Sequence, residues 1–379
     1  MSEPTGPRVM LLGSGELSRE LTTALRHLGA EVTAVNDDVA DADPPGVSAE
    51  LARLEPDFVV TVTDNISDAT LAAVEAIEAV LAGTDEEFTE LVPSARSVRL
   101  TTDREGLRRL ATDELGLPTA PFWFVGSVGE LKEVAVHAGF PLLLKPAGAA
   151  GQRQVVAGPD DIELAWHLAA GQGTAPPRVL AETAVDIEFE VSLLAVRTDG
   201  ADDFKGPVIE FCAPIGHHGA AGVLESWQPQ ELSPAATDAA KSVAARIVKA
   251  LGGRGVFSVE LMINGDEVYF ADVTACPHPS AWVTLRSQRL SAFELQARAI
   301  LGLPVDTMMV SPGAARVLYP DAAAPSADEL TAALGVPESD VRVSGAPKMV
   351  ALATAPDIAT ARDRARQVAA ALYVRDSRA

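Results

Sequence analysis

Three charged side chains lie in sequence surroundings that favour a chemical role: Lys145, Glu260 and Asp272. Lys145 ends the apolar run PLLLKP, and a lysine on a buried strand needs an anionic partner. Glu260 in SVELM and Asp272 in YFADVTA lie on two strand-like runs joined by a tight turn at 264–266, so a hairpin would place them side by side. Adjacent carboxylates repel unless a cation lies between them, which suits Mg²⁺ carrying ATP phosphates. The alternatives are a surface lysine and a solvent-exposed hairpin face.

The turn Gly13-Ser14-Gly15 is a second candidate, because it follows the apolar run MLL and precedes a helical pattern. Backbone N–H groups at such a helix N-terminus can contact an anionic ligand. A dinucleotide fingerprint would require a third glycine near Ser18, which is missing, although Asp37 could serve as its acidic residue. A nicotinamide site is therefore disfavoured, and a purely structural turn remains an alternative.

Histidines and cysteines are weaker candidates. His217, His218 and His278 could act in acid–base chemistry, but an isolated histidine is more often structural. Cys276 could be a nucleophile, yet no neighbour in the sequence would activate it. The two cysteines, Cys212 and Cys276, lack a metal-ligand spacing, so neither a disulfide framework nor a zinc site is indicated.

The elements that must position these residues begin with a parallel-sheet domain over residues 1–97. The run from 8 to 35 has the pattern strand, turn, amphipathic helix, strand, which is one βαβ unit. A strand at 58–64 and a helix at about 67–81 would extend it. The boundary is placed near Ser97, because a charged amphipathic helix that ends at a Gly-Leu-Pro stop follows.

The rest of the chain predicts two further domains. Residues 98–312 alternate short strands with helices, include a long Ala-rich helix near 234–251, and so predict an α+β domain. Residues 313–379 predict a small strand-rich C-terminal domain with a final helix at about 357–372. The fold class is therefore a combination of α/β and α+β.

Composition limits the function. A length of 379 residues favours two or three domains, and 47% hydrophobic with 22% charged residues is typical of globular proteins. No segment is apolar enough to span a membrane, and the start MSEPTGPR lacks the apolar core of a secretion signal, so we expect a cytoplasmic protein. A net charge of -23 argues against nucleic-acid partners and leaves room for a local cationic pocket for ATP.

Segments over nearly the whole chain resemble the formate-dependent phosphoribosylglycinamide formyltransferases, ATP-grasp enzymes of purine synthesis. They are RVMLLGSGEL, LTTDREGLRRLATDELGLPT, LLLKP, EFEVSLLAV, CAPIGH, ESWQPQELSP, SVELMINGDEVYFADV and VTLRSQRLSAFELQARAILGLPV. The resemblance implies a Rossmann-like N-terminal domain, an ATP-grasp domain, a C-terminal domain that completes the site, and a homodimer. It also implies that formate attacks the γ-phosphate of Mg-ATP and that a substrate amine captures the resulting formyl phosphate.

The resemblance assigns nucleotide contacts to five residues. Arg104 and Lys145 match the family's contacts to the ATP phosphates. Glu182 matches the segment that hydrogen-bonds the adenine, with Val185 as the next contact, and Glu190 resembles the carboxylate that holds the ribose hydroxyls. Phosphoryl transfer mainly requires alignment and charge neutralisation, which such residues and Mg²⁺ can provide.

The resemblance also assigns the metal and the lid. Glu260 and Asp272 match the magnesium pair, although the family has glutamate where Asp272 stands, and Thr274 could supply another oxygen. The family's Ser-rich, Gly-Lys-Gly lid loop is GAAGQRQVV here and is one residue shorter. Arg153 could replace the lysine charge of that loop in catalysis, but with a different geometry.

The acceptor half departs further from the family. Glu16 and Leu17 keep the family's contact to the phosphoribosyl substrate, but the acidic residue expected after the third strand falls on Val62, with Asp64 nearby. The family's Arg-Pro-His-Asp is Cys276-Pro277-His278-Pro279 here.

Near the C-terminus, the family's phosphate-binding lysine falls on Ala346, with Lys348 as a shifted replacement, and a loop with two arginines is deleted between Pro347 and Met349. A phosphate monoester is poorly held without two or three cations. We therefore expect an ATP-dependent formyltransferase or carboxylate–amine ligase with a changed acceptor. The alternatives are the family reaction itself and a non-catalytic ATP-binding homologue.

Overall fold

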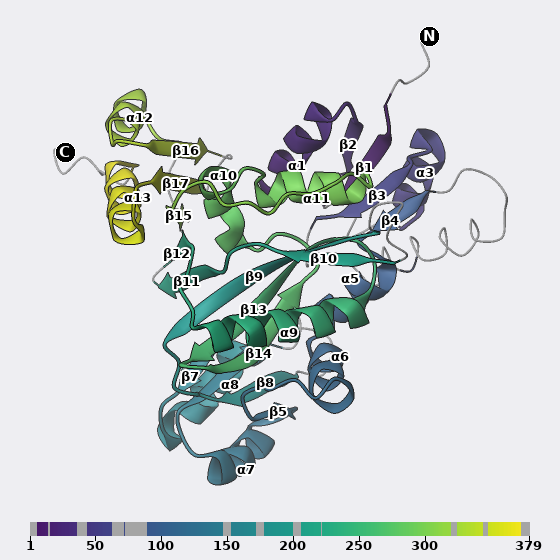
Figure 1. The fold of residues 1–379 in the computed structure, drawn as a ribbon. Helices are drawn as coiled ribbons and strands as arrows, with labels where there is room; N and C mark the ends of the chain where they lie inside the picture. The colour runs from purple at the N-terminus through teal and green to yellow at the C-terminus, as the bar shows by residue number, and fades with distance from the viewer. Residues whose placement is uncertain are drawn as a thin grey trace.

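The computed structural model contains three β-sheets with helices packed against them (Figure 1). It describes residues 6–13, 16–35, 44–62, 72, 89–146, 153–171, 178–199, 206–220, 222–319, 324–343 and 348–372. Among these residues, no helix is long and apolar enough to cross a membrane.

The N-terminal sheet is parallel, with strand order β2-β1-β3-β4. Its strands are β1 (Arg8–Leu12), β2 (Glu31–Val35), β3 (Phe58–Thr61) and β4 (Glu90–Val92), and its helices are α1 (Glu16–His27) and α3 (Pro44–Leu54). Gly13 ends β1 at a φ of 110°, which a residue with a side chain rarely adopts. The predicted βαβ unit is confirmed. Ser14, Gly15, Asp37, Asp64 and the helix expected at 67–81 lie outside the described residues, apart from residue 72.

A helical segment then leads into a small antiparallel sheet. The helices α5 (Ala95–Thr102) and α6 (Arg104–Arg109) meet at Asp103, which caps α6 by accepting the N–H of Gly106, and α6 continues as a π-turn over Leu110–Glu114. The small sheet has the order β5-β8-β6-β7. Its strands are β5 (Phe122–Val125), β6 (Leu142–Pro146), β7 (Gln154–Val156) and β8 (Val179–Thr183), and it packs against α7 (Val128–Ala138) and α8 (Ile162–Ala170).

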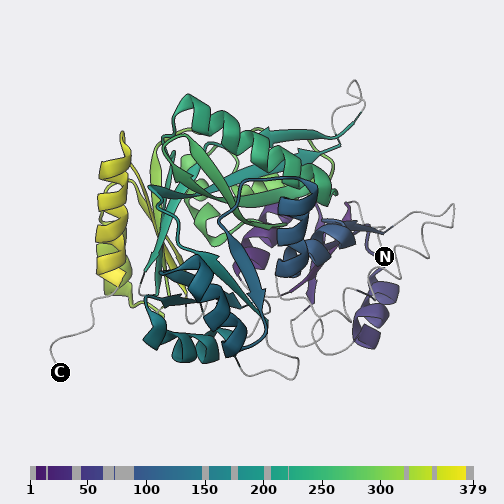
Figure 2. The same cartoon turned by 90° about the horizontal axis from the view of Figure 1, so that it is seen from below.

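The central sheet has nine strands in the order β14-β13-β9-β11-β12-β15-β17-β16, with β10 beside β9. These strands are β9 (Phe189–Thr198), β10 (Val208–Phe211), β11 (Ile215–Ala220), β12 (Val223–Gln228), β13 (Gly255–Asn264), β14 (Glu267–Thr274), β15 (Gly313–Leu318), β16 (Ser339–Val343) and β17 (Met349–Thr354). The helix α9 (Pro234–Leu251) spans the predicted Ala-rich segment and packs on β9, β13 and β14. Figure 2 shows α9 along one part of the sheet and the C-terminal helix, in yellow at the left, beside the C-terminal strands.

The strands that follow residue 312 continue this central sheet, because β15 pairs with β12 along its whole length. The helices α12 (Ala327–Leu334) and α13 (Ile358–Leu372) pack on these C-terminal strands. Between β14 and β15, a 3-10 helix (Pro279–Val283), α10 (Thr284–Ser287) and α11 (Ala292–Ile300) pack on the sheet, and α11 also contacts α1. The N-terminal sheet and α1 thus pack on α11, beside the central sheet. The domain boundaries at 97 and 312 stay predictions.

Candidate active site

A cavity of about 730 Å³ is lined by residues of the small sheet and the central sheet. Its lining includes every residue that the sequence assigned to the nucleotide, the lid charge or the metal: Arg104, Lys145, Arg153, Glu182, Val185, Glu190, Glu260 and Asp272. The structure thus brings together residues that lie far apart in the chain. Leu17 does not line this cavity, and the side chain of Glu16 lies outside the described residues.

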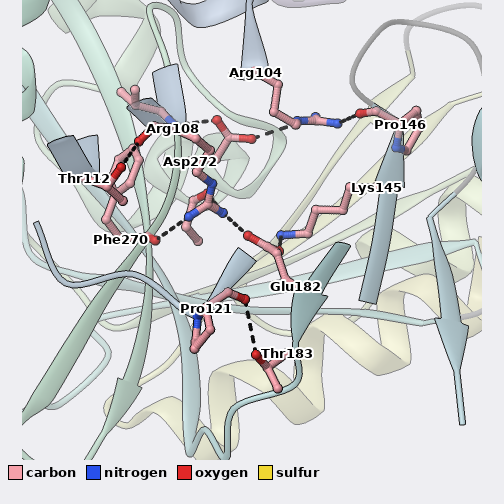
Figure 3. A network of polar contacts seen from close by, with 12 residues as sticks. Arg104, Arg108, Thr112, Pro121, Lys145, Pro146, Glu182, Thr183, Phe270 and Asp272 are labelled. Atoms are coloured by element: carbon pink, nitrogen blue, oxygen red, sulfur yellow. Dashed lines mark hydrogen bonds and ion pairs between the residues drawn. The ribbon is translucent and has the colours of Figure 1, made fainter. Parts of the chain in front are cut away.

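Lys145 and Glu182 line this cavity and form a buried ion pair (Figure 3). They lie on β6 and β8, which are adjacent strands, and Lys145 Nζ is 2.5 Å from Glu182 Oε2. The other carboxylate oxygen of Glu182 accepts a hydrogen bond from Arg108. Burial alone would raise the pKa of Glu182, but the charges of Lys145 and Arg108 hold that pKa below its usual range. Glu182 is therefore a fixed anion between two cations.

Arg108 is the site residue that our sequence reasoning missed. Its side chain is only 2% exposed, and it donates to the carbonyls of Phe270 (3.2 Å) and Ala271 (2.7 Å) as well as to Glu182. It therefore ties α6, β8 and β14 together. One signal was present: Arg108 lies on the same helix face as Leu107 and Ala111, which are both buried, whereas a solvated arginine would lie on the opposite face.

Arg104 lies one turn before Arg108 and reaches the upper part of the cavity. Its guanidinium donates to the carbonyl of Pro146, at the end of β6, and lies 3.9 Å from a carboxylate oxygen of Asp272 (Figure 3). Arg153 is the first described residue after 147–152, the segment that holds most of the lid loop. These guanidinium groups and Lys145 give the cavity its cationic side.

A β-bulge sets the orientation of Glu260 and Asp272. The hairpin turn pairs Asn264 with Glu267, and this register continues to Leu261 opposite Phe270. Glu260 then pairs with Asp272 instead of Ala271. A uniform register would point the two carboxylates to opposite faces of the sheet, so the extra residue Ala271 is what places them on one face. The side-by-side arrangement expected from the sequence is confirmed, although its cause was not foreseen.

Glu260 is hydrogen-bonded by one histidine and lies near a second. His217 Nε2 lies 2.7 Å from Glu260 Oε2, and His278 Nδ1 lies 3.7 Å from Oε1. Burial alone would raise the pKa of Glu260, but the two histidines lower it to about 2. Burial alone would lower the pKa of His217, but the hydrogen bond and charge of Glu260 raise it. His218, by contrast, is exposed on β11.

The donor set around Glu260 fits a metal ion that a nucleotide helps to bind. Glu260 Oε1 is buried and accepts no hydrogen bond from any described residue. Among the described parts of the chain, no three His, Cys, Asp or Glu side chains form a complete metal cluster, so phosphate oxygens would have to supply further ligands. Thr274, the other oxygen that the sequence offered, does not line the cavity, and its hydroxyl donates to the carbonyl of Cys276.

Some of the positions that the resemblance assigned to the acceptor line a second, much smaller pocket. Leu17, Val62, Cys276, Pro277 and Phe293 line a small pocket together. Val62 and Cys276 therefore line the same pocket. The resemblance leads one to expect an acidic residue at the first of these positions and an arginine at the second. The main cavity is bounded here by His278, Pro279 and Tyr319, and Lys348 lies over the Tyr319 ring at 5.2 Å.

The fold and this cavity, lined by both cations and carboxylates, define a protein of the ATP-grasp class, and a family model for the ATP-grasp domain matches residues 110–293. The formate-dependent phosphoribosylglycinamide formyltransferase of Corynebacterium efficiens is 42% identical to this chain, with 98% of this chain and 96% of that protein aligned. That of Rhodococcus jostii is 43% identical, with 96% and 94% aligned. The chain belongs to the formate-dependent phosphoribosylglycinamide formyltransferase family, as the resemblance predicted.

Solved structures agree with this assignment. Glycinamide-RNase-transformylase T from Mycobacterium tuberculosis is 60% identical and superposes with a TM-score of 0.81, covering 96% of this chain and 99% of that chain. An N5-carboxyaminoimidazole synthase from Aspergillus clavatus has a TM-score of 0.78 at 19% identity, covering 97% and 98% of the two chains. The latter likeness concerns the fold alone. The predicted fold class is confirmed.

Proposed function

We propose that this protein uses Mg-ATP to activate formate as formyl phosphate and transfers the formyl group to an amine. The observation that carries the proposal is the convergence of Arg104, Lys145 and Arg153 with the Glu260–Asp272 pair on one cavity. The curated relatives named as formate-dependent formyltransferases support the carboxylate and the type of reaction.

The residues of the cavity have distinct tasks in this reaction. The phosphates are neutralised by Lys145, Arg104 and Arg153. A formate oxygen can then attack the γ-phosphorus, while the bond from that phosphorus to the bridging oxygen of ADP breaks. Glu260 and Asp272 would hold Mg²⁺, which would neutralise further phosphate charge. The amine nitrogen then attacks the formyl carbon, the C–O bond to phosphate breaks, and the nitrogen loses a proton. Val185 and Glu190 contact the nucleoside.

We further propose that the acceptor is an amine other than phosphoribosylglycinamide. Val62 and Cys276 line a small pocket that contains no charged side chain. Two arginines of the C-terminal half are already paired with a carboxylate: Arg286 and Arg342 both contact Asp340, at 2.7 and 2.6 Å. Arg342 also lies 3.6 Å from Glu20. A phosphate monoester would have to displace these carboxylates.

The test is ADP release from Mg-ATP and formate, with phosphoribosylglycinamide and with a panel of other amines. We expect ADP release with an amine of the panel and little with phosphoribosylglycinamide. Rapid release with phosphoribosylglycinamide would instead establish the family reaction. If no amine elicits ADP while ATP still raises the melting temperature, the protein only binds the nucleotide.

A pair of lysine variants tests the site. Lys145→Met should abolish ADP release and weaken ATP binding measured by calorimetry, because the buried cation is lost. Lys132→Met is the matched control, since Lys132 lies on α7 in a surface pair with Glu163. Unchanged ATP affinity in Lys145→Met would contradict the assignment.

The family resemblance also supports a homodimer that acts in the cytoplasm, with Mg²⁺ as the metal. Light scattering of the purified protein tests the first, because a monomeric mass would exclude the dimer. Removal of Mg²⁺ with an excess of chelator should stop ADP release.

A further inference from the structure

We propose that His217 is a positioning residue of the metal site: it holds one oxygen of Glu260 so that the other faces the metal. This inference rests on the proposed function, because it assumes that Glu260 binds the metal that accompanies ATP. The sequence offered His217 only as a possible acid–base residue, with a structural role as the alternative.

The strand register brings His217 to Glu260. His217 on β11 is opposite Glu190 of β9, and Glu260 on β13 is opposite Ser192 of the same β9 strand. The imidazole therefore reaches across β9 to the carboxylate. The side chains are 11% and 14% exposed, and the Nε2 to Oε2 distance is 2.7 Å. A buried hydrogen bond to a carboxylate restricts that carboxylate to one orientation.

The second oxygen of Glu260 makes no hydrogen bond of ordinary geometry among the described residues, although the Ser192 hydroxyl on the opposite strand lies near the carboxylate. His278 is the other nearby histidine, but its Nδ1 accepts the backbone N–H of Ser280 (3.2 Å) and lies 3.7 Å from Oε1. Oε1 is buried and accepts no hydrogen bond within the described structure. A buried carboxylate oxygen without a partner is costly, and a cation would satisfy it.

The two oxygens of Glu260 thus have different partners: His217 on one side and an open position on the other. A histidine or carboxylate that fixes a metal ligand in this way commonly contributes about 10- to 100-fold to metal affinity. Loss of the Nε2 donor would let the carboxylate rotate, so the metal would be bound more weakly even though the ligand itself remains.

Binding of Mn²⁺ in the presence of ADP, measured from the electron paramagnetic resonance signal of the free ion, tests this role without turnover. His217→Leu should weaken Mn²⁺ binding about 10- to 100-fold. His217→Gln, whose amide nitrogen can replace Nε2, should restore most of the affinity. Without metal, the affinity for ADP should be similar in the wild type and both variants. Similar affinities would also show that the variants are folded.

His218→Leu is the matched control, since His218 is exposed on the same strand, and it should bind Mn²⁺ like the wild type. Wild-type affinity in His217→Leu, or a His217→Gln variant as weak as His217→Leu, would overturn the proposal. So would a wild-type protein that binds no Mn²⁺ with ADP. If Mn²⁺ binding follows the expected pattern but no amine supports formate-dependent ADP release, the proposed function fails and the positioning role of His217 stands.

Discussion

At the scale of single residues, the cavity depends on cations whose partners come from distant segments. Arg108 is an example, because its guanidinium satisfies Glu182 and two backbone carbonyls of β14. Removing one partner of a buried ion pair leaves an uncompensated charge, which costs more than the pair contributes.

Arg108→Leu should therefore lower the free energy of unfolding by about 3–5 kcal/mol. Arg109→Leu is the control, because Arg109 is 67% exposed and pairs with Glu105 on the surface, so the expected change is within about 0.5 kcal/mol. Denaturant unfolding of both variants measures the difference. Equal stabilities would contradict the structural role of Arg108.

Glu260 makes stability depend on pH in a defined window. Its folded pKa of about 2 is below the ordinary value of 4.5, so the unfolded chain binds a proton more readily. The stabilisation is present above pH 4.5 and is lost as the pH falls from there toward 2, at about 1.4 kcal/mol per pH unit. The unfolding free energy of wild type should fall more steeply in this window than that of Glu260→Gln. Parallel pH profiles would contradict the shifted pKa.

The sequence predicts such a residue well when its important neighbours are close to it in the chain, and poorly when they are distant. Lys145 and Glu260 were found because each interrupts an apolar strand. Arg108 was missed because its partners Glu182, Phe270 and Ala271 lie more than 70 positions away. The link between His217 and Glu260 was missed for the same reason, since it depends on the order of strands in the central sheet.

At the scale of elements, the β13–β14 hairpin shows that the periodicity of a sequence does not predict strand register. The sequence predicted two strands and a tight turn, but a single extra residue, Ala271, decides which face Asp272 occupies. Whether a strand contains a bulge depends on its partner strands, so the pattern of one strand does not reveal it.

Strand β11 is another element under a local constraint. Gly216 lies beside Trp227, and a Cβ on Gly216 would be 2.5 Å from the indole ring and 2.6 Å from Gln230 Oε1. Trp227 in turn packs against Arg362 of α13 at 3.9 Å. The glycine therefore permits the close approach of β11, β12 and the C-terminal helix.

Gly216→Ala should lower the free energy of unfolding by about 1–3 kcal/mol, because the indole must shift. Gly219→Ala on the same strand should have a much smaller effect, since a Cβ there meets nothing nearer than 4.0 Å. Thermal unfolding of the two variants provides the comparison. A greater loss for Gly219→Ala would show that the crowding at Gly216 is unimportant.

At the scale of the whole molecule, the C-terminal strands are part of the central sheet. β15 pairs with β12 from Gly313 to Leu318, and Glu225 on β12 contacts Arg316, Arg362 and Arg366, which joins α13 to the sheet. The sequence predicted the strands and the final helix of this region, but a boundary at 312 read from composition does not show that they share a sheet.

A chain that ends at residue 312 should therefore fail to form a stable monomer, although the predicted boundary lies there. Loss of β15 removes a full row of hydrogen bonds from β12 and the partners of Glu225. Size-exclusion chromatography and ATP-dependent thermal stabilisation measure the outcome. A monodisperse truncated protein that binds ATP would show that residues 313–379 are a separate unit.

The pairing of β12 with β15 also has a consequence for synthesis on the ribosome. β12 ends at residue 228 and β15 begins at residue 313. The ribosome must therefore synthesise the long segment between them before β15 is available to pair with β12. During that interval the nascent chain presents an unpaired strand edge, which is a template for association with other chains. Translation rate and chaperone supply should therefore influence the yield of this protein more than its final stability would suggest.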